Sequence, residues 1–312
     1  MSDALDIPEE MAIRTLLVPL DGSRLAEAAV APSIAVATGV GAAVTLLHVL
    51  EHDAPTSVHG EPHLATAAAA TAYLERVAGR YAAAGVAVST HVHANPERDV
   101  TGAIAAHAEE LDADLVMLAS HGSGGLRGFL FGRVAQQVVR RGTRPVLIVQ
   151  VRGDDEARRP FVCKTIALLL SGTDEAEAAV PVAVTLAKAL GARLHLISAV
   201  PTVGTLGADR AASATLMPGA ARAVLSIEED TAQTYLRGVA AELGSRGLGV
   251  TTAVVRGDPA DATVDEANRV GADMLALATH GRQGLGGIWA GSVGAKVLSR
   301  FDRALLLARA PG

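Results

Sequence analysis

The chain contains an internal repeat. Residues 18–50 and 168–200 align at an offset of 150 positions and share the string AEAAV. Further along, DADLVMLASHG (residues 112–122) matches GADMLALATHG (residues 271–281) at an offset of 159. Two similar copies must fold as the same unit, so an architecture that suits one half has to suit the other. At 312 residues, the chain divides into two units of about 150 residues each.

The hydrophobic pattern predicts an α/β fold for each copy. Short continuous apolar runs occur at residues 13–20, 44–50, 86–91, 115–119 and 146–151, and Ala-rich stretches with helical spacing separate them. Continuous runs are typical of parallel strands that are covered on both faces. We therefore expect two tandem doubly wound domains, each with a five-stranded parallel sheet. The domains span residues 1–152 and 160–312, with a polar linker at about 153–159.

Local signals refine this prediction. Asp21-Gly22-Ser23, Asn95-Pro96 and Asp258-Pro259 have the composition of turns or helix caps. The longer offset downstream arises because the second copy has extra residues at 201–220, whose Gly and Pro content predicts a loop. Aromatic residues make up only 3% of the chain, so small aliphatic side chains must fill the cores.

Composition also restricts the partners and the location of the protein. A net charge of −6 argues against binding to duplex nucleic acid, which needs clustered Lys and Arg. No apolar run approaches the 18 or so residues of a membrane helix, and the acidic start MSDALDIPEE does not resemble a signal peptide. Cys163 is the only cysteine and is expected to be a small buried hydrophobe. We expect a soluble cytoplasmic protein without nucleic-acid or membrane partners.

One glycine-rich phrase occurs in both copies, as SHGSGGLRGFLFGRV (residues 120–134) and THGRQGLGGIWAGSV (residues 279–293). Each phrase follows a predicted strand and precedes a predicted helix, where free backbone N–H groups and the helix dipole favour an anion. Such loops are typical of phosphate sites, although glycines at these turns also occur for purely structural reasons. The phosphate-binding lysine of a Walker loop is absent, and Arg127 stands where a dinucleotide fingerprint needs its third glycine. The remaining pattern is two glycines separated by nine residues.

This pattern resembles the ATP-binding motif of the universal stress proteins. Gly-x9-Gly-Ser/Thr after the fourth strand, together with VPLDGS (residues 18–23) and RPVLIV (residues 144–149), is similar to that family in its tandem, two-domain form. The resemblance covers nearly the whole chain and implies the adenine nucleotide alpha hydrolase-like fold. The family motif begins with an additional glycine, which is alanine in both copies of this chain.

The resemblance also implies nucleotide-binding residues. Asp21 is expected to bind ribose hydroxyls, the backbone near Val49 to meet adenine, and the two glycines of each phrase to surround the triphosphate. The full set is Pro19, Asp21, Val49, Ala119, Gly122, Gly132, Arg133 and Val134 in the first half, and Ala278, Gly281, Gly291, Ser292 and Val293 in the second.

Neither half carries the complete pattern. Ser171 replaces the aspartate in the second half, and Arg133 replaces the serine in the first. Arg133 either clamps phosphate or points into solvent. The presence of Asp21 favours the first half as the one that binds the nucleotide.

The implied function is that of a cytoplasmic regulatory or stress-response protein that binds ATP or ADP, with Mg as an accompanying ion. We expect no catalytic residues and at most a slow ATPase side activity. The resemblance implies that the two halves pair through their last strands, at residues 145–151 and 304–308, and the chain could also form homodimers. Two alternatives stay open: an interaction scaffold of the same fold that binds no nucleotide, and an adenylate-forming enzyme of the wider class.

Histidines are concentrated in the first half, with seven of the ten between His48 and His107. The pairs His59-x3-His63 and His91-x-His93 have spacings compatible with zinc. Because His59 and His63 fall in a predicted polar loop without a cysteine partner, no metal site is predicted.

Overall fold

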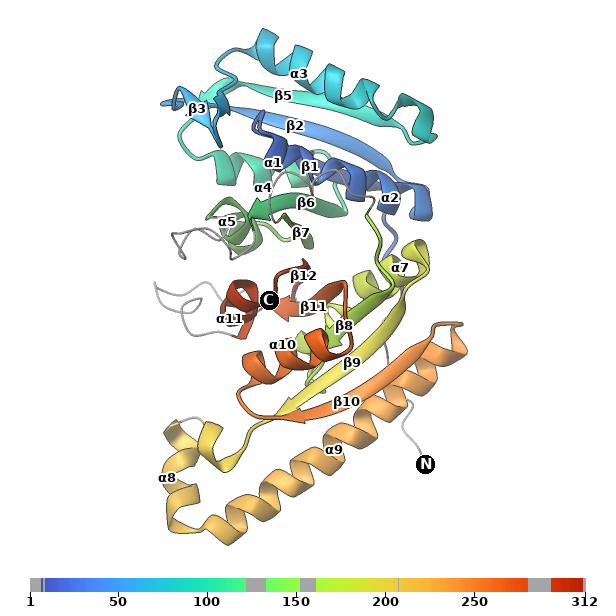
Figure 1. Ribbon diagram of the computed structural model, residues 1–312, viewed down its shortest axis with the longest axis vertical. Coiled ribbons are helices and arrows are strands. Elements are labelled where there is room, and N and C mark those ends of the chain that lie inside the picture. The colour runs from blue at the N-terminus through green and yellow to red at the C-terminus, as the bar shows by residue number, and fades with distance from the viewer. Residues whose placement is uncertain are drawn as a thin grey trace.

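The fold is a single ten-stranded sheet that runs through both halves. The computed structural model describes residues 7, 9–121, 133–151, 161–206, 208–279 and 293–310. The strand order is β10-β9-β8-β11-β12-β7-β6-β1-β2-β5 (Figure 1). The strands are β1 (Thr15–Pro19), β2 (Ala43–Glu51), β5 (Val88–Glu97), β6 (Leu115–His121), β7 (Val146–Val151), β8 (Thr165–Leu169), β9 (Arg193–Val200), β10 (Val250–Arg256), β11 (Met274–Thr279) and β12 (Ala304–Arg309). Within each half all neighbours are parallel, which confirms the predicted doubly wound α/β fold.

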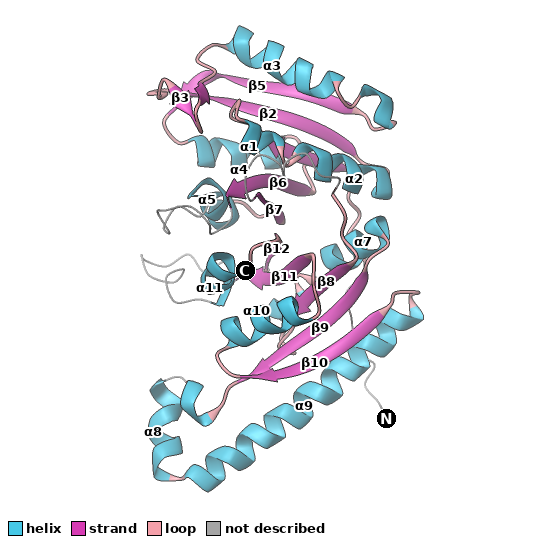
Figure 2. Ribbon diagram, viewed as in Figure 1, coloured by secondary structure: helices cyan, strands magenta, loops and turns pink. Residues whose placement is uncertain are grey.

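Helices cover both faces of the sheet (Figure 2). One face carries α2 (Val30–Val40), α3 (Ala67–Gly79), α7 (Val180–Leu190) and α9 (Pro218–Ser245). The other carries α4 (Val100–Glu110), α5 (Arg133–Arg141), α10 (Pro259–Arg269) and α11 (Val293–Arg300). The short helices α1 (Arg24–Glu27), α6 (Asp174–Glu177) and α8 (Ala208–Leu216) lie in connections.

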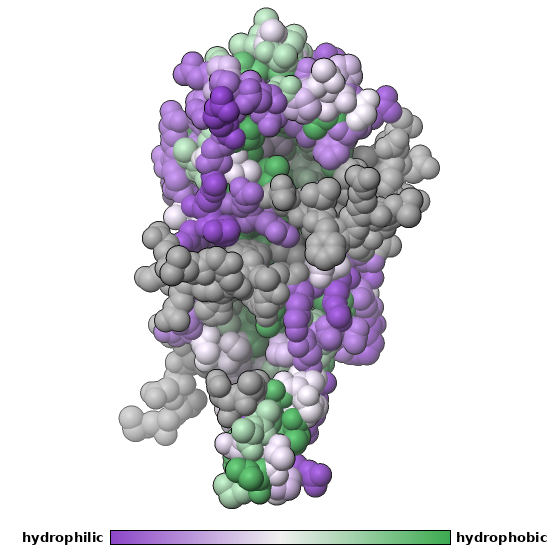
Figure 3. Space-filling view, turned by 90° about the vertical axis from the view of Figure 1, so that its left-hand side faces the viewer, coloured by the Kyte–Doolittle hydropathy of each residue, from purple (hydrophilic) through white to green (hydrophobic). Residues whose placement is uncertain are grey.

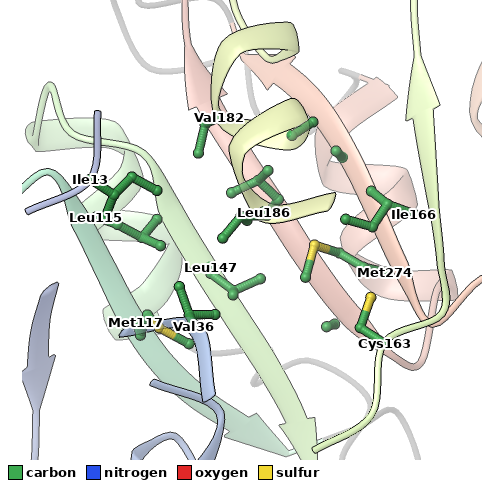
Figure 4. Packing of buried hydrophobic residues seen from close by; sticks show 14 of the residues in the cluster. Ile13, Val36, Leu115, Met117, Leu147, Cys163, Ile166, Val182, Leu186 and Met274 are labelled. Carbon is green, nitrogen blue, oxygen red and sulfur yellow. The ribbon is translucent and has the colours of Figure 1, made fainter. Parts of the chain in front are cut away.

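The two layers of core follow from strand geometry. Successive side chains of a strand point to opposite faces, so Leu16 and Val18 enter one core and Leu17 enters the other. Both cores contain residues from both halves: Figure 4 shows Leu147 of the first half and Leu186 and Met274 of the second in one cluster. The halves therefore share their hydrophobic interior.

The last strands of the two halves lie side by side at the centre of the sheet. β7 and β12 are antiparallel, with Leu147 opposite Leu306. Two hydrogen bonds join the halves near this pair, from Gln150 Nε2 to the carbonyl of Phe301 (2.6 Å) and from Arg309 Nη1 to the carbonyl of Gly142 (2.7 Å). Each strand thereby covers an edge that would otherwise present unpaired backbone groups.

The segment before β1 contacts the second half of the chain. The Thr185 hydroxyl donates to the carbonyl of Met11 (2.7 Å), and Arg246 Nη2 donates to the carbonyl of Ile7 (3.0 Å). Ile7 and Met11 belong to the predicted domain 1–152 in sequence but contact the second half in the structure. The predicted linker at 153–159 lies outside the described residues.

Two local predictions were wrong. Residues 201–220, expected to form a loop, contain a 3₁₀ turn (Val203–Thr205), helix α8 and the start of α9. Alanine has the highest helix propensity, and Pro218 stands at the first turn of α9, where a missing N–H costs nothing. Asn95-Pro96 lies inside β5 and not at a turn. β5 is an edge strand, where proline is tolerated, and the pairing of β2 with β5 shifts register nearby, between Val49 and Glu51.

Cys163 is buried, as predicted, with 4% of its surface exposed. Among the residues that the structure describes, no helix is both long enough and apolar enough to cross a membrane.

Candidate functional site

A pocket lies at the carboxyl ends of β1, β2 and β6 in the first half. Its cavity volume is about 180 Å³. Five residues that the resemblance assigned to a nucleotide line it: Pro19, Asp21, Val49, Ala119 and Val134. These residues come from three strand ends and from the start of α5, and the crossovers of a doubly wound sheet gather such segments at one edge.

The remaining predicted residues are described only in part. Gly122, Gly132, Gly281, Gly291 and Ser292 lie outside the described residues, as does the side chain of Arg133, whose backbone begins α5.

The second half repeats the strand-to-helix arrangement without the aspartate. Ala278 lies in β11 and Val293 begins α11, so both stand where Ala119 and Val134 stand in the first half. In place of Asp21, Ser171 lies with its hydroxyl 3.3 Å from that of Thr173.

Asp21 is held by the turn that follows β1. Its Oδ1 accepts hydrogen bonds from the backbone N–H of Ser23 (2.9 Å) and from the Ser23 hydroxyl (2.6 Å). The Ser23 oxygen in turn caps α1 by accepting from the N–H of Ala26. Gly22, between them, has a φ of +94°, which a residue with a side chain rarely adopts. This turn orients the second oxygen, Oδ2, toward His59, whose Nε2 lies 3.9 Å away.

His48 lies in the wall of the pocket and is almost completely enclosed. It interrupts the apolar run of β2 and is 2% exposed. Its Nδ1 lies 2.7 Å from the carbonyl of Leu20, and because a carbonyl only accepts, the proton is on Nδ1. Nε2 is buried and makes no hydrogen bond. Burial lowers the pKa of His48, against the opposing effect of the hydrogen bond to the Leu20 carbonyl, so the ring is neutral at pH 7.

A small hairpin closes one side of the pocket. β3 (Ser57–Val58) and β4 (Glu61–Pro62) are joined through His59 and Gly60, which have φ values of 49° and 85°. Beyond the hairpin, His63 lies with Nε2 3.5 Å from a carboxylate oxygen of Glu51 and with Nδ1 buried and unpaired. The sequence predicts a polar loop for this region. The signal for a turn was Gly60, because glycine readily adopts the positive φ that a two-residue hairpin turn needs.

Sequence reasoning also missed His48. The signal was a single polar residue within a continuous apolar strand, because a buried imidazole needs a partner for each ring nitrogen. Within the described ranges, no group of three or more His, Cys, Asp or Glu side chains is arranged to hold a metal ion.

The remaining surface of the pocket is mainly apolar. Leu47, Val49, Ile104, Leu118 and Ala119 form much of it. An apolar wall with a few fixed polar groups is typical of sites for small organic ligands. The start of α5 adds the positive end of a helix dipole beside Val134, which favours a negatively charged group there.

Comparisons with known proteins agree with this architecture. The model of the universal stress protein family matches twice, at residues 12–150 and 163–309. A search of curated protein sequences found no match.

Solved structures show the same two-domain fold at low sequence identity. A putative universal stress protein from Pseudomonas aeruginosa is 19% identical, with a TM-score of 0.66 over 96% of this chain and 94% of that one. A universal stress protein from Archaeoglobus fulgidus is 16% identical, with a TM-score of 0.62 over 95% of this chain and 96% of that one. The two family matches together span most of the chain, and it belongs to the universal stress protein family as a tandem of two domains.

Proposed function

We propose that the protein binds an adenine nucleotide, ATP or ADP, in the first-half pocket and acts as a regulatory stress-response protein. The observation that carries this proposal is the Asp21 carboxylate at one end of an apolar pocket that borders the N-terminus of α5. A nucleotide has groups that match each of these features: ribose hydroxyls, a flat apolar base and a negatively charged phosphate chain.

Each residue has a role in this proposal. Asp21 accepts hydrogen bonds from the ribose hydroxyls through Oδ2, because Ser23 already occupies Oδ1. His48 fixes the wall of the pocket through the hydrogen bond from its Nδ1 to the carbonyl of Leu20. Val49 and Ala119 provide the apolar surface for the base, and the start of α5 faces the phosphates.

The first half is the proposed site because the second lacks two of these groups. Ser171 stands at the position of Asp21, and Ser198 in β9 stands at the position of His48, given that both halves pair their first two strands in the same register. A serine hydroxyl in place of a carboxylate loses a charged acceptor.

Isothermal titration calorimetry of the full chain with ATP and with ADP, with and without Mg, tests the proposal. Asp21→Asn keeps an acceptor for Ser23 but removes the charge, and Ser171→Ala is the matched control in the second half. A hydrogen bond to a charged group contributes about 1.5–3 kcal/mol, so the Kd of Asp21→Asn should rise by roughly 10- to 150-fold. The control should bind like the unaltered chain. An equal loss of affinity in both variants, or a loss only in the control, would contradict the assignment of the site to the first half.

The main alternative is an interaction scaffold that binds no nucleotide. Folded chain that shows no heat of binding and no rise in melting temperature with ATP supports this alternative, because a ligand that binds only the folded state must stabilise it. We also propose a cytoplasmic location, pairing of β7 with β12 that persists in solution, and ATP turnover that is slow at most. Pyrophosphate exchange from labelled ATP would instead indicate an adenylate-forming enzyme.

A further inference from the structure

Three histidines of the first half lie together at one edge of the sheet. His91 and His93 belong to the edge strand β5, and His107 belongs to α4 (Figure 1). We call these three residues the histidine cluster. The ring centroid of His107 lies 4.7 Å from that of His91 and 5.0 Å from that of His93. Because alternate residues of a strand share a face, both histidines of β5 point to the side on which α4 lies.

The hydrogen bond within the cluster requires a neutral ring. His107 Nε2 lies 2.9 Å from His93 Nδ1. A neutral imidazole has one donor and one acceptor nitrogen, whereas a protonated imidazole has two donors. The bond therefore tolerates a proton on one of the two rings. When both rings are protonated, two N–H groups face each other and the contact becomes repulsive.

Among the described residues, the carboxylates that face the cluster are partly exposed to solvent. A Glu110 oxygen lies 2.9 Å from Nδ1 of His107, and the Glu110 side chain is 66% exposed. A Glu97 oxygen lies 3.2 Å from Nε2 of His93, and the Glu97 side chain is 41% exposed. Water and salt screen such pairs, so these carboxylates offset only part of the repulsion between two protonated rings.

The other surroundings of the cluster also favour the neutral form. Leu47 and Val49 of β2, the register partners of the two β5 histidines, are apolar and buried. The remaining acidic residues between positions 99 and 110 are already in ion pairs, Asp99 with Arg141 and Glu109 with Arg144. His107 is 7% exposed. Burial, followed by the charge of His91, lowers the pKa of His107 against the opposing effect of Glu110.

We propose that the histidine cluster is a pH-sensitive contact that holds α4 against β5 at neutral pH and releases this edge of the sheet in mild acid. The releasing step is protonation of the second ring of the hydrogen-bonded pair. β5 is bonded to the sheet through β2 alone, so this edge can loosen while the centre of the sheet stays paired. α4 also lines the pocket with Val100 and Ile104, so its release alters the pocket wall. The inference does not depend on what the pocket binds.

The second half supplies an internal control. Glu266 of α10 stands at the repeat position of His107, at the offset of 159. Its Oε1 lies 2.9 Å from Nε2 of His195 in β9, and Arg269 pairs with the same carboxylate. A protonated His195 would face a carboxylate and not another imidazole. Mild acid should therefore leave α10 in place.

Amide hydrogen exchange of the full chain at about pH 7.5 and pH 5.5, corrected for the intrinsic exchange rates, tests the proposal. Because the pKa of His107 is lowered in the folded chain, its contribution to stability is fully present above the ordinary histidine pKa of about 6.5 and is lost as the pH falls below it. A histidine that is protonated only after opening raises the opening equilibrium about tenfold at one pH unit below its ordinary pKa. Protection in α4 and β5 should fall by about this factor, and protection in α10 and β10 should not.

Variants identify the responsible ring. His107→Gln keeps a hydrogen-bonding side chain but does not titrate, so the fall in protection should disappear. His52→Gln, at a histidine whose side chain is 45% exposed, is the matched control and should behave like the unaltered chain. His93→Gln replaces the less buried partner of the same hydrogen bond and should also remove the fall, which covers the case in which His107→Gln does not fold.

Three outcomes would overturn the proposal. One is protection in α4 and β5 that does not change with pH, and another is an equal fall in α10 and β10. The third is a fall that persists in both cluster variants, which would assign the effect to another group such as the buried His48. Exposed apolar side chains gather where α8 meets α9, at the lower end of the molecule in Figure 3. Association through that end would slow exchange there and would not speed exchange in α4 and β5, so the expected result is specific to the cluster.

Discussion

Gly39 provides a direct test of how closely the two halves pack. It lies near the end of α2, against α7 of the other half. A Cβ added at Gly39 would lie 2.3 Å from the carbonyl oxygen of Ala189 and 2.9 Å from its Cα. Residues 39 and 189 correspond to one another in the repeat, so the contact lies where equivalent helices of the two halves meet. Only glycine allows this approach.

Two opposing effects decide the result of Gly39→Ala. In a helix, alanine is favoured over glycine by about 0.8–1.0 kcal/mol. Overpacking costs about 1–3 kcal/mol, and the upper part of that range applies here because the contacted atoms are backbone and cannot rotate away. We therefore expect a net loss of about 1–2 kcal/mol in the free energy of unfolding.

Gly244→Ala is the matched control. Gly244 lies in α9, and a Cβ added there meets nothing within 4 Å. Only the helix-propensity effect remains, so this variant should gain up to about 1 kcal/mol. Equilibrium urea denaturation of the full chain measures both. Opposite signs support the contact between α2 and α7. A stabilised Gly39→Ala variant, equal to Gly244→Ala, would refute it.

Three further predictions concern other buried or capping groups. Burial, followed by the charge of Asp273, raises the pKa of Cys163 to about 12, so iodoacetamide should alkylate the folded chain at pH 8 far more slowly than the urea-unfolded chain. The hydrogen bond from Arg269 lowers the pKa of Glu266 in the folded chain. The ionised carboxylate therefore stabilises the fold above the ordinary carboxyl pKa, and this stabilisation is lost as the pH falls through the pKa of Glu266 in the folded chain. In thermal melts Glu266→Gln should be less stable than the unaltered chain at pH 7, and the difference should narrow below about pH 4. Asp258 caps α10, and Asp258→Ala should cost about 1 kcal/mol in urea denaturation.

Each of these predictions has a contrary outcome. Equal alkylation rates for folded and unfolded chain would mean that Cys163 is reachable in the native state. A constant difference between Glu266→Gln and the unaltered chain from pH 7 to pH 3 would show that ionisation of this carboxyl is not the source of its effect. An unchanged urea midpoint for Asp258→Ala would mean that other groups satisfy the first N–H groups of α10.

The fold was predictable from the sequence because its signals are local and occur twice. Continuous apolar runs identified β1, β2, β6 and β7, and Asp258 identified a helix cap. The prediction was wrong at residues 201–220, because the helix propensity of the alanines there outweighs the turn preference of the glycines and prolines. In the structure, Pro218 begins a helix, so the same residue that suggested a break marks a start.

The candidate site was predictable only in part. Asp21, Val49 and Ala119 stand at strand ends, and strand ends of a doubly wound sheet meet at one edge, so their presence in one pocket followed from topology. The positions of His48 and of the hairpin around His59 in the pocket could not be predicted from the topology of the sheet. Their part in the pocket depends on how β2 and the hairpin approach β1, which is a contact between segments distant in sequence.

The sequence by itself determined the duplicated α/β unit and the difference between Asp21 and Ser171, because periodicity, turn chemistry and residue identity are local properties. The tertiary structure decided that His48 is buried against the carbonyl of Leu20, that Gly39 meets the backbone of Ala189, and that Val224 and Ile227 of α9 face outward. Each of these depends on which surfaces the folded chain covers. The burial of a side chain depends on the packing of the whole molecule and cannot be read from a short segment of the sequence.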